Sequence, residues 1–166
     1  RAASLMMPCP WALGAVSFLR AHPEIPFGVH LTAIWDAGDY TWGPLAWRDK
    51  VPALVDAAGR FHSMHSFPAV MDQAGLAQLE LEFRAQIEAV LAAGLKPAHL
   101  DWHALRLDRH PEIYDLAFRL ARAYGLALRV TGEAMRQKVR RLGLPCSDDD
   151  LLDSFSLEPS TKAARY

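Results

Sequence analysis

The sequence predicts an α/β fold in which parallel strands alternate with helices. Two observations predict it. Short apolar runs that read as strands alternate with longer segments whose apolar residues recur at helical spacing. Histidines and an aspartate also lie near the ends of two predicted strands. Parallel α/β folds place their ligand sites at the carboxyl ends of the strands.

Each element is predicted from its apolar pattern and from the glycine or proline beside it. The longest predicted helix has an apolar stripe that runs from Leu79 to Leu91, and Gly94 follows its end. Pro111 begins the next helix, and Gly125 follows that one. The predicted elements, in chain order, are the strand Ala3–Met7, the helix Trp11–Ala21, the strand Phe27–Thr32, the helix Leu76–Ala93, the strand His99–His103, the helix Pro111–Tyr124, the strand Leu126–Val130, the helix Thr131–Leu142 and a helix in DDDLLDSF that Asp148 caps.

Residues 33–75 are predicted to form a long loop insertion, because they are rich in aromatic residues, Gly, Pro and Asp. A loop of that length inside a compact domain is usually functional, or it contains small elements of its own. Its aromatic side chains could stack on sugar rings or anchor the loop by ordinary burial, and the sequence favours neither. They are Trp35, Tyr40, Trp42 and Trp47.

Composition and charge exclude several classes of partner. The net charge is −1, and the lysines and arginines are spread along the chain, so we expect no nucleic-acid partner. No run of about 18 apolar residues occurs, so we expect no membrane partner. Cys9 and Cys146 lack the spacing of a disulfide framework or a zinc knuckle, and we expect free thiols and a cytoplasmic location.

The stretch PAHLDWH is the most informative part of the sequence. His99, Asp101 and His103 occupy every second position of a predicted strand, so their side chains would point the same way. Leu100 and Trp102 would point the other way, toward an apolar layer. Burying three such polar groups without partners would cost several kcal/mol, and the spacing therefore indicates a functional site.

His30, near the carboxyl end of its strand, could pair with His103 to hold a divalent ion. Asp101 would then be a third ligand, or an acceptor that fixes the tautomer of a ligating imidazole. Such an ion lowers the pKa of bound water and polarises a carbonyl group. His62 and His65 form a rival pair, although solvated loop histidines explain that pair better.

Three segments together resemble the YdjC/ChbG-like carbohydrate deacetylases. They are FGVHLT, KPAHLDWH and HPEIYDLAFRLARAYGLALRV, and the resemblance covers most of Ala3 to Val130. It implies an irregular (β/α) TIM-like barrel, related to that of polysaccharide deacetylases. It also implies metal-dependent hydrolysis that removes N-acetyl groups from carbohydrates such as acetylated chitooligosaccharides.

Carried over to this chain, the resemblance implies that His30 and His103 are metal ligands. It implies a catalytic role for Asp101. This carboxylate would either support the catalytic base or hydrogen-bond to a residue that binds the metal. The implied cofactor is a divalent metal ion, Mg or Zn, and the implied partner is a small carbohydrate substrate.

The chain also departs from the family pattern. Ala104, Leu105 and Arg106 stand where the family often has further histidines. The family begins with a strand that ends in an Asp-Asp pair, which supplies a metal ligand and a base, and it has a further C-terminal portion. We therefore expect residues 1–166 to be a single catalytic domain that is an internal portion of a longer deacetylase domain. The barrel would be incomplete, and its open edges favour a homodimer.

Two alternative functions stay open at the level of the sequence. One is another metal-dependent sugar enzyme on a similar barrel, such as an isomerase or a hydrolase of a different bond. The other is a non-catalytic carbohydrate-binding protein that lacks the carboxylate pair. Release of acetate distinguishes the deacetylase from both.

Overall fold

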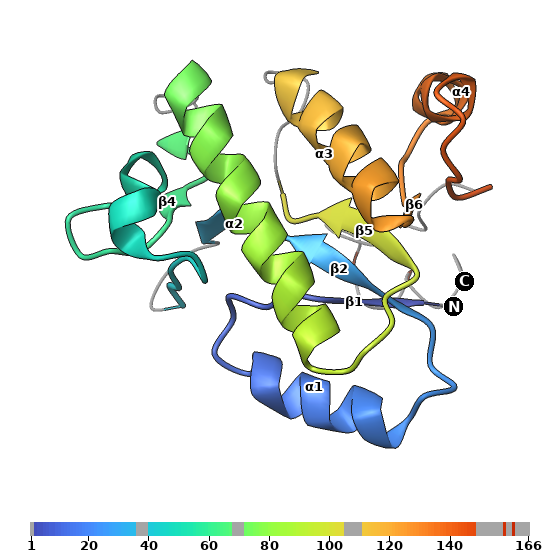
Figure 1. Ribbon diagram of the computed structural model, residues 1–166, viewed down its shortest axis with the longest axis horizontal. Coiled ribbons are helices and arrows are strands. Elements are labelled where there is room, and N and C mark those ends of the chain that lie inside the picture. Colours follow the sequence, from blue (N-terminus) through green and yellow to red (C-terminus); the bar gives the residue numbers. More distant parts are fainter. Residues whose placement is uncertain are drawn as a thin grey trace.

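The computed structural model describes residues 2–35, 40–67, 72–104 and 111–148, together with Glu158 and Thr161. Its main sheet has four parallel strands that lie side by side in chain order (Figure 1). They are β1 (Ala3–Leu5), β2 (Phe27–Leu31), β5 (His99–Trp102) and β6 (Ala127–Leu128). The predicted α/β class is confirmed. The sheet that the described residues form is open, so the predicted barrel is not seen in them.

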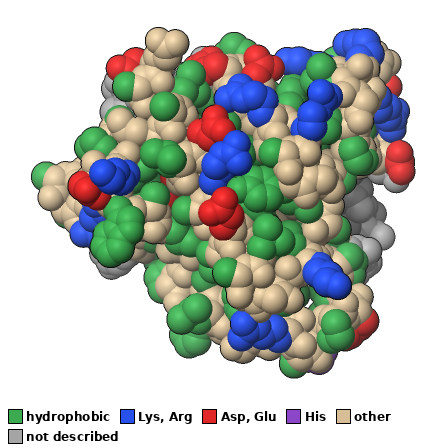
Figure 2. All heavy atoms as spheres, viewed as in Figure 1, with side chains coloured by type: hydrophobic (Ala, Val, Ile, Leu, Met, Phe, Trp, Pro, Cys, Tyr) green, Lys and Arg blue, Asp and Glu red, His purple; other side chains and the backbone are tan. Residues whose placement is uncertain are grey.

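Helices connect the strands, and α2 and α3 lie side by side across β2 and β5 (Figure 1). This helical face carries acidic and basic side chains interspersed with hydrophobic ones (Figure 2). Within the described residues, no helix has both the length and the apolar character needed to span a bilayer. The helices are α1 (Ala12–Ala21), α2 (Gln73–Ala92), α3 (Pro111–Tyr124) and α4 (Glu133–Arg141).

The register of the sheet separates an apolar face from a polar one. Leu5, Val29, Leu100 and Leu128 lie opposite one another on successive strands, and none is more than 5% exposed. They belong to one hydrophobic core with the buried side chains of α2 and α3. Because side chains alternate along a strand, the residues between them point to the other face. Those residues are Ser4, Gly28, His30, His99 and Asp101.

The part of segment 33–75 that the structure describes contains small elements, which the sequence did not resolve. β3 (Ile34–Trp35) pairs in parallel with β4 (His62–Ser63). Two short 3-10 helices, η1 (Arg48–Lys50) and η2 (Pro52–Leu54), lie between them in the chain. The insertion also has buried apolar side chains of its own: Trp42, Val51, Leu54, Phe61 and Phe67.

α2 begins at Gln73, inside the predicted loop rather than at Leu76. The reason is a helix cap, since the Asp72 carboxylate accepts a hydrogen bond from the Gly75 N–H at 2.7 Å. The predicted apolar stripe is buried up to Val90. Leu91 is 42% exposed, so its assignment to the stripe was wrong.

Two carboxyl-terminal elements are shorter than predicted: β6 contains only Ala127–Leu128, and α4 contains Glu133–Arg141. Gly132 adopts a φ of 81°, in the left-handed region, and α4 therefore starts after it, at Glu133. The segment around Cys146 then forms a parallel bridge with Leu128, which continues the strand–helix alternation. The helix predicted to follow Asp148 lies outside the described residues.

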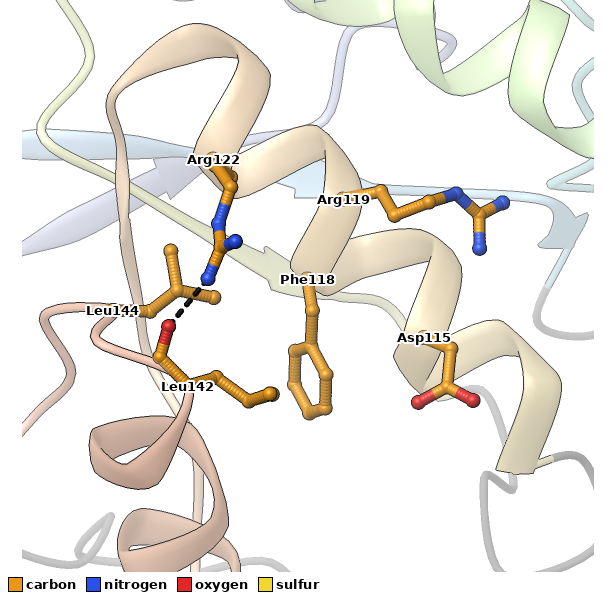
Figure 3. A pocket seen from close by; sticks show the side chains of 6 residues that line it. All are labelled: Asp115, Phe118, Arg119, Arg122, Leu142 and Leu144. Carbon is orange, nitrogen blue, oxygen red and sulfur yellow. Dashed lines mark hydrogen bonds between the residues drawn. The ribbon is translucent and has the colours of Figure 1, made fainter.

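α4 is attached to α3 through polar contacts at the edge of a surface hollow. The Arg122 guanidinium donates a hydrogen bond to the carbonyl oxygen of Leu142, at the end of α4 (Figure 3). Lys138 Nζ lies 3.4 Å from the Asp115 carboxylate. The hollow is bordered by Phe118 and lies in the helical layer, away from the polar face of the sheet (Figure 3).

Two fully buried polar side chains on α2 hold the insertion in place. The Glu82 carboxylate accepts hydrogen bonds from the N–H groups of Leu45, at 3.1 Å, and Ala46, at 2.8 Å. Gln86 donates to Glu82 at 2.7 Å and exchanges two hydrogen bonds with the backbone of Thr32. Burial raises the pKa of the Glu82 carboxyl, although the three hydrogen bonds that it accepts oppose this effect.

Candidate functional site

The candidate site lies at the carboxyl ends of β2 and β5, where the register places His30 opposite Asp101. His30 Nδ1 lies 2.7 Å from Asp101 Oδ1. Both residues were predicted from their positions near strand ends, and the structure brings them into direct contact. Parallel pairing explains the contact, because residues that are opposite each other on neighbouring strands point to the same face.

Asp101 is the centre of a buried hydrogen-bonding cluster. Its side chain is 5% exposed. Asp101 Oδ2 accepts a hydrogen bond from Ser4 Oγ at 2.7 Å and forms an ion pair with the Arg129 guanidinium. Burial raises the pKa of Asp101, but the hydrogen bonds from His30 and Ser4 and the charge of Arg129 lower it more. The carboxyl is therefore ionised at neutral pH and can only accept hydrogen bonds.

The contact with an ionised carboxylate determines the tautomer of His30. A carboxylate can only accept, so Nδ1 must carry the proton in this hydrogen bond. In the neutral imidazole, Nε2 then carries the lone pair, which is the state that a metal requires. The side chain is 20% exposed, so the ring remains within reach of a ligand.

His103 lies beside His30, immediately after the end of β5. The centroids of the two rings are 5.5 Å apart, in a T-shaped arrangement. The His103 N–H donates to the Leu31 carbonyl at 2.8 Å, which fixes its backbone to the end of β2. The Trp42 ring, from the insertion, borders the same site at 6.1 Å from the His103 ring. The structure thus brings the two predicted metal histidines together.

His99, the first histidine of the PAHLDWH stretch, lies two residues before Asp101 on β5, and its side chain points to the same face of the sheet. Its Nε2 is 3.4 Å from Ser4 Oγ and 4.0 Å from Asp101 Oδ2. Burial lowers its pKa, so the ring is neutral at neutral pH. Its ring lies across Gly28, where an added Cβ atom would come within 2.4 Å of it.

Gly28→Ala is therefore expected to displace the His99 ring and to lower the free energy of unfolding by about 1–3 kcal/mol, the usual cost of overpacking. Denaturant unfolding of both proteins measures the change. Gly14→Ala is the matched control, because an added Cβ on α1 meets nothing closer than 3.5 Å. A Gly28→Ala protein as stable as the control would contradict the expectation.

Ser4 and Arg129 were not predicted as site residues. Ser4 lies on the three-residue strand β1, and Arg129 follows the two-residue strand β6. In such short elements an isolated polar residue carries little signal. A signal does exist in LALRV, where Ala127 and Arg129 alternate with apolar residues. Ala127 lies opposite His99 in the sheet. Because side chains alternate along a strand, Arg129, two residues later, lies on the same polar face.

The residues that the structure describes contain no cluster of three or more His, Cys, Asp and Glu side chains arranged to hold an ion. His30 and His103 fit two positions of such a site, because both are imidazoles and one has its tautomer fixed. In the rival pair, His65 is exposed and His62 is partly exposed. Neither Cys9 nor Cys146 forms a disulfide.

Comparison with known proteins identifies the family. The sequence model described as YdjC-like protein matches residues 1–164. The chain belongs to the YdjC-like family. The YdjC/ChbG-like resemblance predicted from the histidine-containing strands is thus confirmed.

Relatives of this YdjC-like chain include proteins named as deacetylases. It is 31% identical to the carbohydrate deacetylase of Thermoanaerobacter pseudethanolicus over 90% of this chain and 56% of that protein. It is 29% identical to the chitooligosaccharide deacetylase of Serratia marcescens over 81% of this chain and 50% of that protein. The chain thus spans about half the length of these relatives.

A crystal structure with a similar fold is that of a putative cellobiose-phosphate cleavage protein from Enterococcus faecalis. The TM-score is 0.76 at 26% sequence identity, and the match covers 95% of this YdjC-like chain and 61% of the other.

Proposed function

We propose that this chain carries the histidine site of a metal-dependent carbohydrate deacetylase. The substrates would be N-acetylated carbohydrates such as acetylated chitooligosaccharides, and the domain would be an irregular TIM-like barrel. The observation that carries the proposal is the hydrogen bond from His30 Nδ1 to Asp101, beside His103. The names of the relatives support the reaction class.

His30 and His103 would hold the divalent ion, Mg or Zn. When bound, such an ion lowers the pKa of a water molecule and polarises the acetyl carbonyl. Asp101 keeps the proton on His30 Nδ1, which leaves Nε2 available for the metal. Ser4 and Arg129 stabilise Asp101 as a carboxylate. In this proposal Asp101 is a positioning residue that acts through His30.

Hydrolysis of an amide also requires a base for the water proton and an acid for the leaving amine. Asp101 is unsuited to either role, because His30, Ser4 and Arg129 occupy its oxygens and keep it ionised. We therefore assign the base and the acid to other groups. We also propose a cytoplasmic location, with which two cysteines outside any disulfide agree, and a homodimer.

A second candidate function is cleavage of a different bond in a sugar, such as a phosphorylated disaccharide. The name of the similar crystal structure favours it, since that protein is described as a putative cellobiose-phosphate cleavage protein. The same histidine pair could serve either hydrolysis.

The test is to incubate the purified protein with an N-acetylglucosamine oligomer or with cellobiose phosphate, with added Mg or Zn. We expect acetate and a free amine from the first substrate, loss of the activity with a chelator, and its return when metal is added. Cleavage of cellobiose phosphate without release of acetate would support the second candidate. Sugar binding without turnover, unaffected by the chelator, would indicate a non-catalytic binding protein.

A further inference from the structure

One face of α2 carries three polar side chains that hold backbone segments outside the helix. Their spacing of four residues places them one above another along the helix. The acceptors are Gln78, Glu82 and Gln86, and their respective donors are the N–H groups of Ala53, of Leu45 with Ala46, and of Thr32. The insertion is therefore attached to α2 by hydrogen bonds as well as by apolar contacts (Figure 1).

Glu82 is the member of this row that joins the insertion to the histidine strand. Its Oε1 accepts a hydrogen bond from Gln86 Nε2 at 2.7 Å, and the same Nε2 donates to the Thr32 carbonyl at 2.6 Å. Thr32 lies two residues after His30, and the carbonyl of the residue between them accepts the His103 N–H. One buried carboxylate thus connects the insertion to the end of β2, to which both histidines are attached.

The insertion reaches His103 through Trp42, three residues before the segment that Glu82 holds. The indole nitrogen is buried and has no hydrogen-bond partner in the part of the chain that the structure describes. An unpaired buried donor costs free energy, so no polar contact of its own holds this ring in place. Its position depends on packing and on the backbone at either side, where Phe61 N–H donates to the Trp42 carbonyl and Leu45 N–H donates to Glu82.

Only a carboxylate serves all three donors that converge on position 82. Oε1 accepts from the Leu45 N–H and from Gln86, and Oε2 accepts from the Ala46 N–H at 2.8 Å. A carboxamide has one oxygen, and in either orientation its NH2 group would face another donor. Glu82→Gln therefore leaves the volume of the side chain almost unchanged but pushes the segment that contains Leu45 and Ala46 away from α2.

From these contacts we infer that Glu82 is a positioning residue of the histidine site, which acts through the insertion to hold Trp42 against His103. This inference rests on the proposed function and adds to it a residue that lies on α2, away from the reacting atoms. A misplacement of about 1 Å, caused by a change far from the chemistry, can slow a reaction about 100-fold.

The first test is the rate of acetate release from an N-acetylglucosamine oligomer with added Mg or Zn. Glu82→Gln should lower kcat/KM about 10–100-fold, measured at a temperature at which its unfolding curve shows it to be folded. Gln78→Ala is the matched control, because it removes a hydrogen bond between the same face of α2 and the insertion at Ala53, further along the chain from Trp42. The control should keep nearly the kcat/KM of the unaltered protein.

The second test is nuclear magnetic resonance of the His103 ring, which needs no activity. Its resonances are assigned by their loss in His103→Ala. In Glu82→Gln they should shift toward the positions that they have in Trp42→Leu, which lacks the indole ring, whereas Gln78→Ala should not move them. In the variant that combines Glu82→Gln with Trp42→Leu, the losses in kcat/KM should be less than additive in free energy, because both residues act through one contact.

The inference is wrong if folded Glu82→Gln keeps the His103 resonances of the unaltered protein, or if Gln78→Ala moves them equally. If Glu82→Gln does not fold, Glu82→Asp takes its place. It keeps the carboxylate on a chain one methylene shorter and must shift the same resonances. Failure of the proposed function gives a different result, since the unaltered protein would then release no acetate while the His103 resonances would still move in Glu82→Gln.

Discussion

Replacing His30 by alanine is expected to abolish stoichiometric binding of Mg or Zn, with little change in the fold. The hydrogen bond from Nδ1 to Asp101 leaves Nε2 as the metal donor, and removing the ring deletes that donor. His103→Ala should do the same, because its ring is the neighbour of His30 in the site. Metal content per chain after dialysis, together with the circular dichroism spectrum, measures both effects.

The control for the metal experiment is His22→Ala. His22 lies just after α1, where its Nδ1 contacts the Glu24 carboxylate at 3.1 Å, and it is half exposed. It therefore shares the His-carboxylate contact but lies outside the candidate site. Asp101→Asn should weaken metal binding by about 10–100-fold, the usual effect of removing the partner of a ligating histidine. Retention of one metal per chain in the His30 or His103 variant would contradict the proposed site.

Glu82→Ala is expected to have the largest effect on stability. It removes the acceptor for two backbone N–H groups and for one N–H of the Gln86 amide, which keeps its hydrogen bond to the Thr32 carbonyl. Each donor that loses its partner away from water costs about 1–3 kcal/mol, so the free energy of unfolding should fall by about 2–4 kcal/mol. Denaturant unfolding at neutral pH measures it.

Glu80→Ala provides the comparison on the same helix. The Glu80 side chain is 30% exposed and forms surface ion pairs with Arg84 and Arg119, at 2.7 Å and 3.3 Å. Such pairs contribute at most about 1 kcal/mol, so this variant should remain nearly as stable as the unaltered protein. Equal losses in the two variants would show that Glu82 does not hold the insertion.

The helices and strands were predictable where the hydrophobic pattern was long or bounded by glycine and proline. The helix Pro111–Tyr124 was predicted with its observed bounds. Asp101 was predicted as a metal ligand or as an acceptor for a ligating imidazole, and the pairing of β2 with β5 supplies its contact with His30. Glu82 could not be found in this way. Glu82 lies two residues after Glu80, which is on the surface. The N–H groups that donate to the Glu82 carboxylate come from the folded insertion, which the sequence pattern did not resolve.

The sequence also did not predict the short elements or the contacts between segments that are distant in the chain. β3, β4 and the two 3-10 helices contain two or three residues each, too few for a periodic pattern. Ser4 and Arg129 gain their significance from Asp101, which lies far from Ser4 in the chain. Their roles depend on the order of strands in the sheet, which the sequence pattern alone does not specify.

The agreement between strand order in the sheet and strand order in the chain also bears on biosynthesis. Each strand of the main sheet pairs with the preceding strand of that sheet, so the sheet can extend in the direction of translation. His30 emerges early, but its carboxylate partner follows only with β5, and Arg129 only after β6. A nascent chain that ends before β5 therefore has neither the fixed imidazole nor its neighbour His103. The site is completed only once the strands on which it depends have been synthesised.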